Sequence, residues 1–322
     1  KVSDLKTYFF TDEGVAKAVD GVHFDVKKGE VLGLVGESGC GKSVTALSIL
    51  RLVAYPPGRT VGGKVEFMGK DLLSLDNREM RKIRGQKISM IFQDPLTCLN
   101  PVLKVGYQLS EVFHYHRQLS WENSLQEASR MLKITDIPSP EDRVKNYPHE
   151  MSGGMRQRAM IAMALACEPA LLIADEPSTA LDVTVQAQVL GLMKELCRER
   201  KTAILLITHD MGVIANMCDR VAVMYAGRIV EYTDVFTLFK QPAHPYTKSL
   251  LNSLPRLGAK RNRLDSIEGQ PPQLNRLPFG CAFQPRCKYA VARCEKEAPE
   301  ITTIGASREI RCFNPVNGGK NA

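Results

Sequence analysis

Hydrophobic residues along the chain form short continuous runs that alternate with longer segments of helical spacing. Largely apolar runs of this length are typical of strands buried in a parallel sheet. They occupy 31–35, 88–92, 171–174, 203–208 and 221–225. Apolar residues that recur every three or four positions predict helices at 44–50 and 183–200. This strand–helix alternation predicts an α/β fold, a parallel sheet with helices on both faces.

Shorter strands are predicted outside this core. The first thirty residues contain a partly alternating segment at Val19, Val22 and Phe24, as expected of a half-exposed strand. Residues 63–69 have the pattern of a hairpin and follow the strong breaker at 55–58. We expect these strands to form an antiparallel β subdomain beside the parallel core.

A mostly helical stretch separates the two halves of the core. Helical spacing covers 105–118 and 120–134, and Ser152 is placed to cap a third helix that runs to Ala166. The pattern predicts a helical subdomain at about 94–168.

Charge and proline content both change near residue 240. The C-terminal tail, residues 241–322, contains 13 Lys and Arg against 6 Asp and Glu, and half of the 18 prolines. We therefore predict one domain at 1–240 and a second at 241–322. A basic tail can bind nucleic acid or anionic lipid, but a solvated basic surface is the simpler explanation of the charge alone.

No apolar run approaches the roughly 20 residues that span a bilayer. We expect any membrane contact of this chain to be made through partner proteins.

The stretch Gly36–Ser43 reads G-x-x-x-x-G-K-S, and it lies between a predicted strand and a predicted helix. Glycines let the backbone wrap around a polyphosphate, and the helix N-terminus adds positive potential there. Lys42 can reach the β- and γ-phosphates, and the Ser43 hydroxyl can bind Mg²⁺. We name Gly36–Ser43 the phosphate-binding loop.

Two carboxylates follow the apolar run 171–174. Asp175 is a candidate for the magnesium shell, and Glu176 can polarise a water at the γ-phosphate. Gln93 also follows a strand, and its amide can contact Mg²⁺ or that water. His209 follows another strand and can donate a hydrogen bond to the γ-phosphate, although a lone histidine is more often structural.

A second anion site is predicted where Ser152, Gly153 and Gly154 open a helix. One nucleotide needs only one phosphate loop in each chain, so a second such site suggests a nucleotide shared with another subunit.

These motifs together resemble those of the ATP-binding-cassette (ABC) ATPases, over residues 1 to about 240. The signature here begins with Met151 where the general pattern has leucine, and Met155 matches a variant of peptide importers. Three further stretches resemble the C-terminal extension of dipeptide, oligopeptide and nickel importer ATPases: 244–247, 269–272 and 280–287.

The resemblance implies an ABC ATPase at 1–240, with ATP and Mg²⁺ as cofactors and with catalytic roles for Glu176, His209 and Gln93. Mg²⁺ would be held by Ser43, Gln93 and Asp175. The expected nucleotide contacts are Tyr8 or Phe9 (with Phe10 open as a third candidate for stacking on adenine), Gly36, Ser38, Gly39, Cys40, Gly41, Lys42, Ser43, Val44, Ser152, Gly153 and Gly154.

The resemblance also implies partners. ATP would be trapped between the phosphate-binding loop of one subunit and Ser152–Gly154 of a second ABC ATPase subunit, with residues 178–182 facing that subunit. Two transmembrane permease subunits and, indirectly, a peptide-binding protein complete the expected importer of di- and oligopeptides. The chain would then lie peripherally on the cytoplasmic face of the cell membrane.

Two alternatives to peptide import remain open. One is the same role for nickel or another small solute. The other is a soluble ABC ATPase acting on nucleic acid. Such proteins usually contain a coiled-coil insertion or two tandem cassettes. Neither pattern is present in this sequence, so we expect no nucleic-acid partner.

Four of the nine cysteines cluster in the tail, with the spacing C-x5-C-x6-C-x17-C: Cys281, Cys287, Cys294 and Cys312. Four thiolates can hold either Zn²⁺ or a [4Fe–4S] cluster. The resemblance to peptide importers implies the [4Fe–4S] cluster, with zinc as the alternative and four ordinary cysteines as the simplest explanation. Five basic residues nearby could offset the charge of such a group: Arg286, Lys288, Arg293, Lys296 and Arg311.

Overall fold

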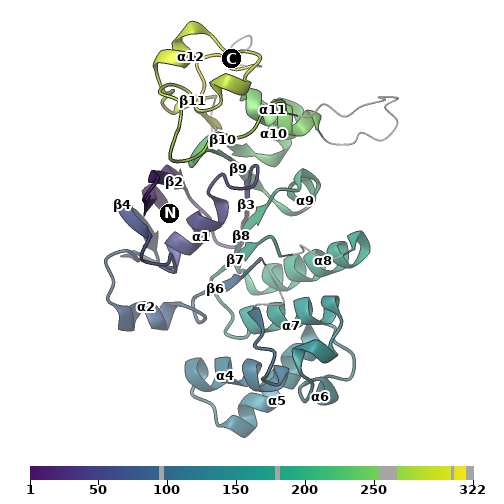
Figure 1. The fold of residues 1–322 in the computed structure, drawn as a ribbon. Coiled ribbons are helices and arrows are strands. Elements are labelled where there is room, and N and C mark those ends of the chain that lie inside the picture. The colour runs from purple at the N-terminus through teal and green to yellow at the C-terminus, as the bar shows by residue number, and fades with distance from the viewer. Residues whose placement is uncertain (94–97, 178–181, 254–266, 306–307, 317–322) are drawn as a thin grey trace. The chain divides into compact units, whose positions relative to one another are not determined.

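A computed structural model describes residues 1–93, 98–177, 182–253, 267–305 and 308–316 (Figure 1). The chain forms two compact units. The first unit contains residues 1–25, 32–74 and 208–322, and the second contains 26–31 and 75–207. The C-terminal tail thus belongs to the first unit, and the predicted boundary near residue 240 stays a prediction.

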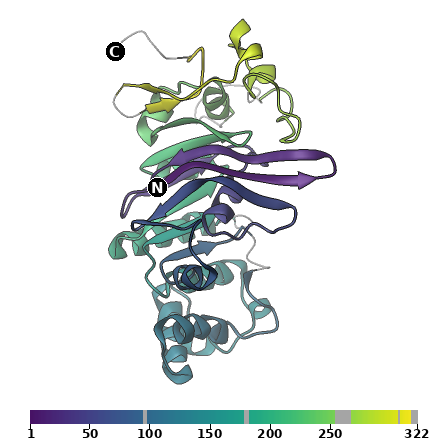
Figure 2. The same cartoon turned by 90° about the vertical axis from the view of Figure 1, so that its left-hand side faces the viewer.

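The first unit contains an antiparallel sheet in the order β2-β1-β4-β5, in which β1 and β2 form the long hairpin seen in Figure 2. Its strands are β1 (Val2–Thr11), β2 (Gly14–Phe24), β4 (Gly58–Phe67) and β5 (Lys70–Asp71). This confirms the antiparallel strands predicted from the alternating pattern. The predicted hairpin of 63–69 corresponds to the end of β4 and the turn that leads to β5, and β4 begins five residues earlier than that pattern indicated.

A second set of strands in the first unit has the order β11-β12-β10-β9-β3. Its members are β3 (Val31–Val35), β9 (Arg220–Tyr225), β10 (Arg228–Asp234), β11 (Thr302–Ile304) and β12 (Arg308–Ile310). β3 and β9 pair in parallel, as predicted, whereas β10 pairs antiparallel with β9. The tail adds two strands to the sheet, because β12 pairs with β10 and β11 pairs with β12.

The tail packs on this sheet through aromatic side chains. Tyr225 of β9, Tyr246 and Phe283 are almost fully buried, with ring centroids 4.6 to 5.3 Å apart. Such pairs add about 0.5–1.5 kcal/mol each beyond the burial of their area. The helices of the first unit are α1 (Lys42–Ile49), α9 (Met211–Met217), α10 (Val235–Lys240), α11 (Pro245–Asn252), η2 (Gln284–Arg286) and α12 (Ala292–Lys296).

The second unit contains three parallel strands, β6 (Ile88–Ile91), β7 (Leu171–Asp175) and β8 (Ala203–Thr208). Its helices are α2 (Asn77–Ile83), α4 (Val105–Arg117), α5 (Trp121–Ile134), α6 (Pro140–Arg143), η1 (Pro148–Glu150), α7 (Gly153–Leu165) and α8 (Val183–Arg200). The helices expected between 105 and 166 are therefore present. Side chains of Ser120, Ser152 and Asp182 cap α5, α7 and α8 by accepting backbone N–H groups.

None of the helices in the described ranges is both long and apolar enough to cross a membrane.

Candidate active site

The phosphate-binding loop connects β3 to α1, and two of its glycines are required by close packing. A Cβ atom at Gly36 would lie 2.2 Å from the carbonyl oxygen of Met224, and one at Gly41 would lie 2.0 Å from that of Ala18. Gly41 also has a φ of 108°, which favours glycine, and it is the N-cap of α1. The loop therefore has the close-packed backbone expected of a phosphate cradle.

Lys42 begins α1, and its side chain lies inside the loop. Its Nζ donates hydrogen bonds to the carbonyl oxygens of Gly36 and Glu37, at 2.8 and 3.0 Å. The Cys40 sulfur lies 3.9 Å from the same Nζ, and burial raises the pKa of this thiol, which keeps it neutral. The ammonium group is thus held over the loop by two neutral carbonyl groups.

The remaining loop residues differ in exposure. Ser38 and Gly39 are exposed, whereas Ser43 and Val44 are half-buried in the first turn of α1. This places accessible backbone at the tip of the loop and a hydroxyl at its base.

The second unit brings Gln93 and Glu176 together. β6 and β7 are parallel neighbours with Ile91 opposite Ala174, so the residues after each strand lie at the same edge. The amide Nε2 of Gln93 donates to Oε2 of Glu176 at 3.2 Å.

Glu176 itself has a φ of 46° and donates its N–H to the carbonyl oxygen of Ile207 at 2.8 Å. This backbone turn directs the chain away from β7 immediately after Asp175, which is buried.

His209 comes directly after β8 and is exposed. The next residue, Asp210, caps α9 by accepting the N–H groups of Gly212 and Val213, at 2.7 and 3.3 Å. Asp210 therefore serves as a helix cap, and His209 is exposed at the carboxyl end of its strand.

The second predicted anion site opens α7. The Ser152 hydroxyl accepts the N–H of Met155 at 3.3 Å, and Ser152 is exposed. Gly154 packs near α8, because a Cβ atom there would lie 3.0 Å from Val185. The site thus stands open to another molecule. Residues 178–181, expected to face a second subunit, lie outside the described residues.

The aromatic candidates for adenine stacking have different surroundings. The Tyr8 hydroxyl donates to Asp20 at 2.7 Å, and Lys17 lies over its ring. Burial and the bond to Asp20 raise the pKa of Tyr8 to about 12. Phe9 lies on β1 opposite Gly58 of β4 and is half-buried, and Phe10 is 49% exposed.

The four tail cysteines lie close together, and none is in a disulfide. The N–H of Cys281 donates to the carbonyl oxygen of Cys294 at 2.8 Å. Burial, followed by the charges of the other three thiols, raises the pKa of Cys312 to about 12. Among the described residues, however, no three Cys, His, Asp or Glu side chains are arranged to hold a metal ion. The donor set suits a metal group, but its ligand geometry is not formed.

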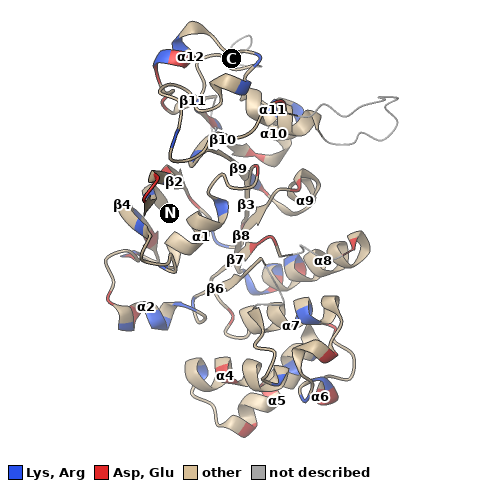
Figure 3. Cartoon of the chain, in the orientation of Figure 1, with Lys and Arg blue, Asp and Glu red and all other residues tan. Residues whose placement is uncertain are grey.

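Several basic residues expected to offset the charge of a cysteine site pair with carboxylates instead. Lys288 pairs with Glu268, and Arg293 pairs with Glu297 within and beside α12, where Figure 3 shows both charge signs. Another basic residue of the tail, buried Arg308 on β12, pairs with Glu231 of β10. The positive charge of the tail is therefore partly neutralised.

One contact at the phosphate-binding loop was not predicted from the sequence. Arg286 forms a two-pronged ion pair with Glu37, at 2.7 and 2.9 Å. Glu37 occupies a position that the loop pattern leaves open, and its partner lies 249 residues away. The sequence placed Arg286 only among the basic residues beside the tail cysteines, and nothing in it linked Arg286 to Glu37.

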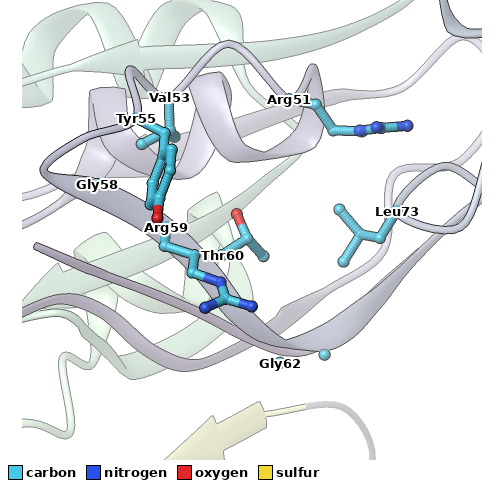
Figure 4. A pocket seen from close by; sticks show the side chains of 9 residues that line it. Arg51, Val53, Tyr55, Gly58, Arg59, Thr60, Gly62 and Leu73 are labelled. Carbon is cyan, nitrogen blue, oxygen red and sulfur yellow. The ribbon is translucent and has the colours of Figure 1, made fainter. Parts of the chain in front are cut away.

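A hollow of about 720 Å³ lies in the first unit, near the C-terminal end of α1 (Figure 4). Its walls include Arg51, Tyr55, Arg59 and Thr60. None of the predicted nucleotide-binding residues lines it, so size alone does not identify the nucleotide site.

Comparison with known proteins matches two family models to the chain. One, described as "ABC transporter", covers residues 19–179. The other, described as "Oligopeptide/dipeptide transporter, C-terminal region", covers residues 230–294. The fold is also similar to that of the ABC cassette MJ0796 in a dimeric post-hydrolysis state bound to ADP and Pi. That similarity has a TM-score of 0.65 and 26% identity, and it covers 73% of this chain and 98% of the other.

Relatives match this chain over nearly its full length. The probable peptide ABC transporter ATP-binding protein y4tR of Sinorhizobium fredii is 53% identical over 97% of this chain and 93% of that protein. The oligopeptide transport ATP-binding protein OppD of Salmonella typhimurium is 51% identical over 98% and 93%. AppD of Bacillus subtilis, also an oligopeptide transport ATP-binding protein, is 50% identical over 97% and 95%. The chain therefore belongs to the ABC transporter family and, within it, to the ATP-binding proteins of oligopeptide and dipeptide transporters.

Proposed function

We propose that this protein hydrolyses ATP to energise the uptake of di- and oligopeptides through a membrane importer. The observation that carries the chemistry is the placement of Glu176, one residue after a buried strand and hydrogen-bonded to Gln93. Relatives named for peptide transport supply the cargo class, since they match both the ATPase part and the tail.

ATP would bind with its phosphates over the phosphate-binding loop. Lys42 exchanges its two carbonyl partners for phosphate oxygens, and the exposed backbone of Ser38 and Gly39 faces the same anion. Ser43, Asp175 and Gln93 would hold Mg²⁺, which offsets the charge of the phosphates. Phe9 is the better candidate for stacking on adenine, because Tyr8 is held by Asp20 and covered by Lys17.

Hydrolysis would use Glu176 as the group that polarises the attacking water. The neutral amide of Gln93 orients the Glu176 carboxylate without protonating it. His209, exposed after β8, donates a hydrogen bond to the γ-phosphate and so favours the charge that develops there.

A second ATPase subunit would complete the site. Exposed Ser152, with Gly153 and Gly154, presents hydroxyl and backbone donors to the γ-phosphate bound by that subunit. The dimeric state of MJ0796 with ADP and Pi supports this arrangement. We infer that a pair of such subunits contacts two permeases at the cytoplasmic face of the membrane, and that a peptide-binding protein delivers the cargo.

The tail cysteines would hold a [4Fe–4S] cluster or, alternatively, zinc. Cys281, Cys287, Cys294 and Cys312 supply four thiols that already interact electrostatically. The bound group would act as a structural clip that ties the proline-rich tail together. Anaerobic purification followed by an absorption spectrum and iron and zinc analysis tests this. Colourless protein with stoichiometric zinc excludes the cluster, and protein with neither metal excludes both.

The proposed function is tested by measuring ATP turnover of the complex with its two permeases, with and without a peptide-loaded binding protein. We expect peptide to raise turnover. A nickel-loaded binding protein that raises turnover, while peptides do not, would replace the peptide cargo with nickel.

A further inference from the structure

The C-terminal tail contacts the phosphate-binding loop at Glu37. Both guanidinium nitrogens at the end of Arg286 bind the Glu37 carboxylate, with Nη1 2.7 Å from Oε2 and Nη2 2.9 Å from Oε1. The Arg286 side chain is only 5% exposed and that of Glu37 24%. Two-pronged pairs of this kind fix orientation as well as distance. Arg286 therefore holds the Glu37 carboxylate in one position.

The tail also fixes the backbone of Glu37. Its N–H donates to the hydroxyl of Tyr246, on α11, at 2.8 Å, and its carbonyl oxygen accepts from Lys42. That carbonyl oxygen also accepts the N–H of Cys40 at 3.3 Å. Every polar group of Glu37 thus has a partner, and the two partners outside the loop, Arg286 and Tyr246, belong to the tail. When Lys42 turns to the phosphates of ATP, Arg286 and Tyr246 still hold the carboxylate and the N–H of Glu37.

Arg286 is itself held firmly. Its Nη1 also donates to the Tyr225 hydroxyl at 3.3 Å, and its Nε donates to the carbonyl oxygen of Glu268 at 3.1 Å. The bond to Glu37 raises the pKa of Arg286, so the guanidinium stays charged at any working pH. The pair is therefore a permanent link between the tail and the loop.

The charge of Glu37 explains why this link matters for nucleotide binding. A carboxylate inside a phosphate-binding loop repels the triphosphate, and the repulsion is strong where water is partly excluded. Pairing with Arg286 cancels that charge. An unpaired Glu37 would both repel ATP and be free to rotate away from its place in the loop.

We propose that Arg286 is a positioning residue for ATP binding, which acts by pairing with Glu37 and so lets the C-terminal tail set the ATP affinity of the phosphate-binding loop. This rests on the proposed function, because it assigns the tail a role at the same ATP site. The tail then contributes to ATP binding through the position of Glu37 in the phosphate-binding loop.

The test measures the Kd for ATP of the full chain, and KM and kcat of the complex with its permeases. Arg286→Ala should raise Kd and KM by about tenfold, the size of coupling seen between residues in one network. We expect kcat to change by less than about twofold, because Arg286 does not touch the reacting groups. Arg286→Lys keeps the positive charge and should recover part of the affinity. The recovery should be incomplete, because an ammonium group cannot make both bonds to the carboxylate at once.

Lys288→Ala provides the matched control. Lys288 lies two residues from Arg286 in the same tail, but its pair with Glu268 is exposed on both sides, at 75% and 76%. Its loss should leave Kd, KM and kcat at wild-type values.

A second variant separates positioning from a general loss of stability. In Arg286→Ala with Glu37→Gln, the unpaired carboxylate is gone, so the double variant should bind ATP more tightly than Arg286→Ala alone. Tyr246→Phe, which keeps the buried ring, should weaken binding in the same direction. If Arg286→Ala does not fold, Arg286→Lys and Tyr246→Phe carry the same test.

The outcomes separate this inference from the proposed function. A wild-type Kd for ATP in Arg286→Ala, or in both Arg286→Lys and Tyr246→Phe, would overturn this inference and leave the proposed function intact. A double variant that binds ATP no more tightly than Arg286→Ala alone would also overturn it. A wild-type chain that binds no ATP would overturn the proposed function itself.

Discussion

The side-chain amide of Gln93 donates a hydrogen bond to the carboxylate of Glu176, with 3.2 Å between Nε2 and Oε2. The two residues are 83 positions apart in the chain, and the parallel pairing of β6 with β7 brings them to one edge. A neutral amide can orient a carboxylate without competing with it as a base. The contact therefore fits a carboxylate that must be held in one orientation.

Glu176→Gln should lower kcat for ATP hydrolysis by about 10²- to 10⁴-fold, the usual contribution of a general base. ATP binding should persist, because the phosphates are held by the loop that contains Lys42. Steady-state turnover and nucleotide affinity, measured on the same preparation, check this. Normal turnover in the variant would remove Glu176 from this role.

Lys42→Ala should abolish tight ATP binding. The buried ammonium is aimed into the loop, and each hydrogen bond to a charged group contributes about 1.5–3 kcal/mol, so Kd should rise at least tenfold. Equilibrium binding of a fluorescent nucleotide measures the effect. Lys64→Ala, which breaks an exposed pair with Glu66, is the control and should bind as the wild type does.

Phe9→Ala should weaken ATP binding more than Tyr8→Phe does. Stacking of a base on an aromatic ring contributes about 1–3 kcal/mol, so Kd should rise roughly fivefold or more in Phe9→Ala. Tyr8→Phe keeps its ring and loses only the hydrogen bond to Asp20. A larger loss in Phe10→Ala than in Phe9→Ala would assign the stacking to Phe10.

His244 should make stability depend on pH in the acid range. Complete burial lowers its pKa from 6.5 to about 3, against an opposing hydrogen bond that the imidazole donates to the backbone of Arg311. The unfolded chain takes up a proton near pH 6.5, but the folded chain does not until about pH 3. The free energy of unfolding therefore falls as pH drops below about 6.5, by up to about 1.4 kcal/mol per pH unit from this group.

The matched variant for His244 is His244→Asn, because asparagine can still accept the N–H of Tyr246 as the cap of α11. Its unfolding free energy should depend less steeply on pH between 6.5 and 5 than that of the wild type. Exposed His149→Asn should leave the slope unchanged. Equal slopes for His244→Asn and the wild type would contradict the assignment. Urea denaturation at several pH values gives the slopes.

Local patterns predicted the elements that carry the site. The apolar runs of β3, β6, β7 and β8 could be recognised because buried parallel strands are continuously hydrophobic. The helix that Ser152 caps was likewise predicted from its polar start and helical spacing. Pattern and propensity act over a few residues, and these features depend on little else.

Relationships between distant segments could not be predicted in this way. β10 was missed because its antiparallel pairing depends on β9 rather than on its own sequence, and the strand that the tail adds through β12 depends on β10. The pair of Arg286 with Glu37 depends on the packing of Tyr225, Tyr246 and Phe283, which places the tail on the sheet. Composition indicated that the tail is basic, but not that several of its cations are paired with carboxylates.

The central claim is that ATP hydrolysis through Glu176 drives peptide uptake, and transport of a labelled oligopeptide into proteoliposomes tests it most directly. The vesicles would contain this chain, its partner ATPase subunit and the two permeases, with peptide-loaded binding protein on the side opposite the ATPases. We predict uptake that requires ATP and that Glu176→Gln abolishes. Steady ATP hydrolysis with no peptide uptake, or uptake that persists in Glu176→Gln, would contradict the account.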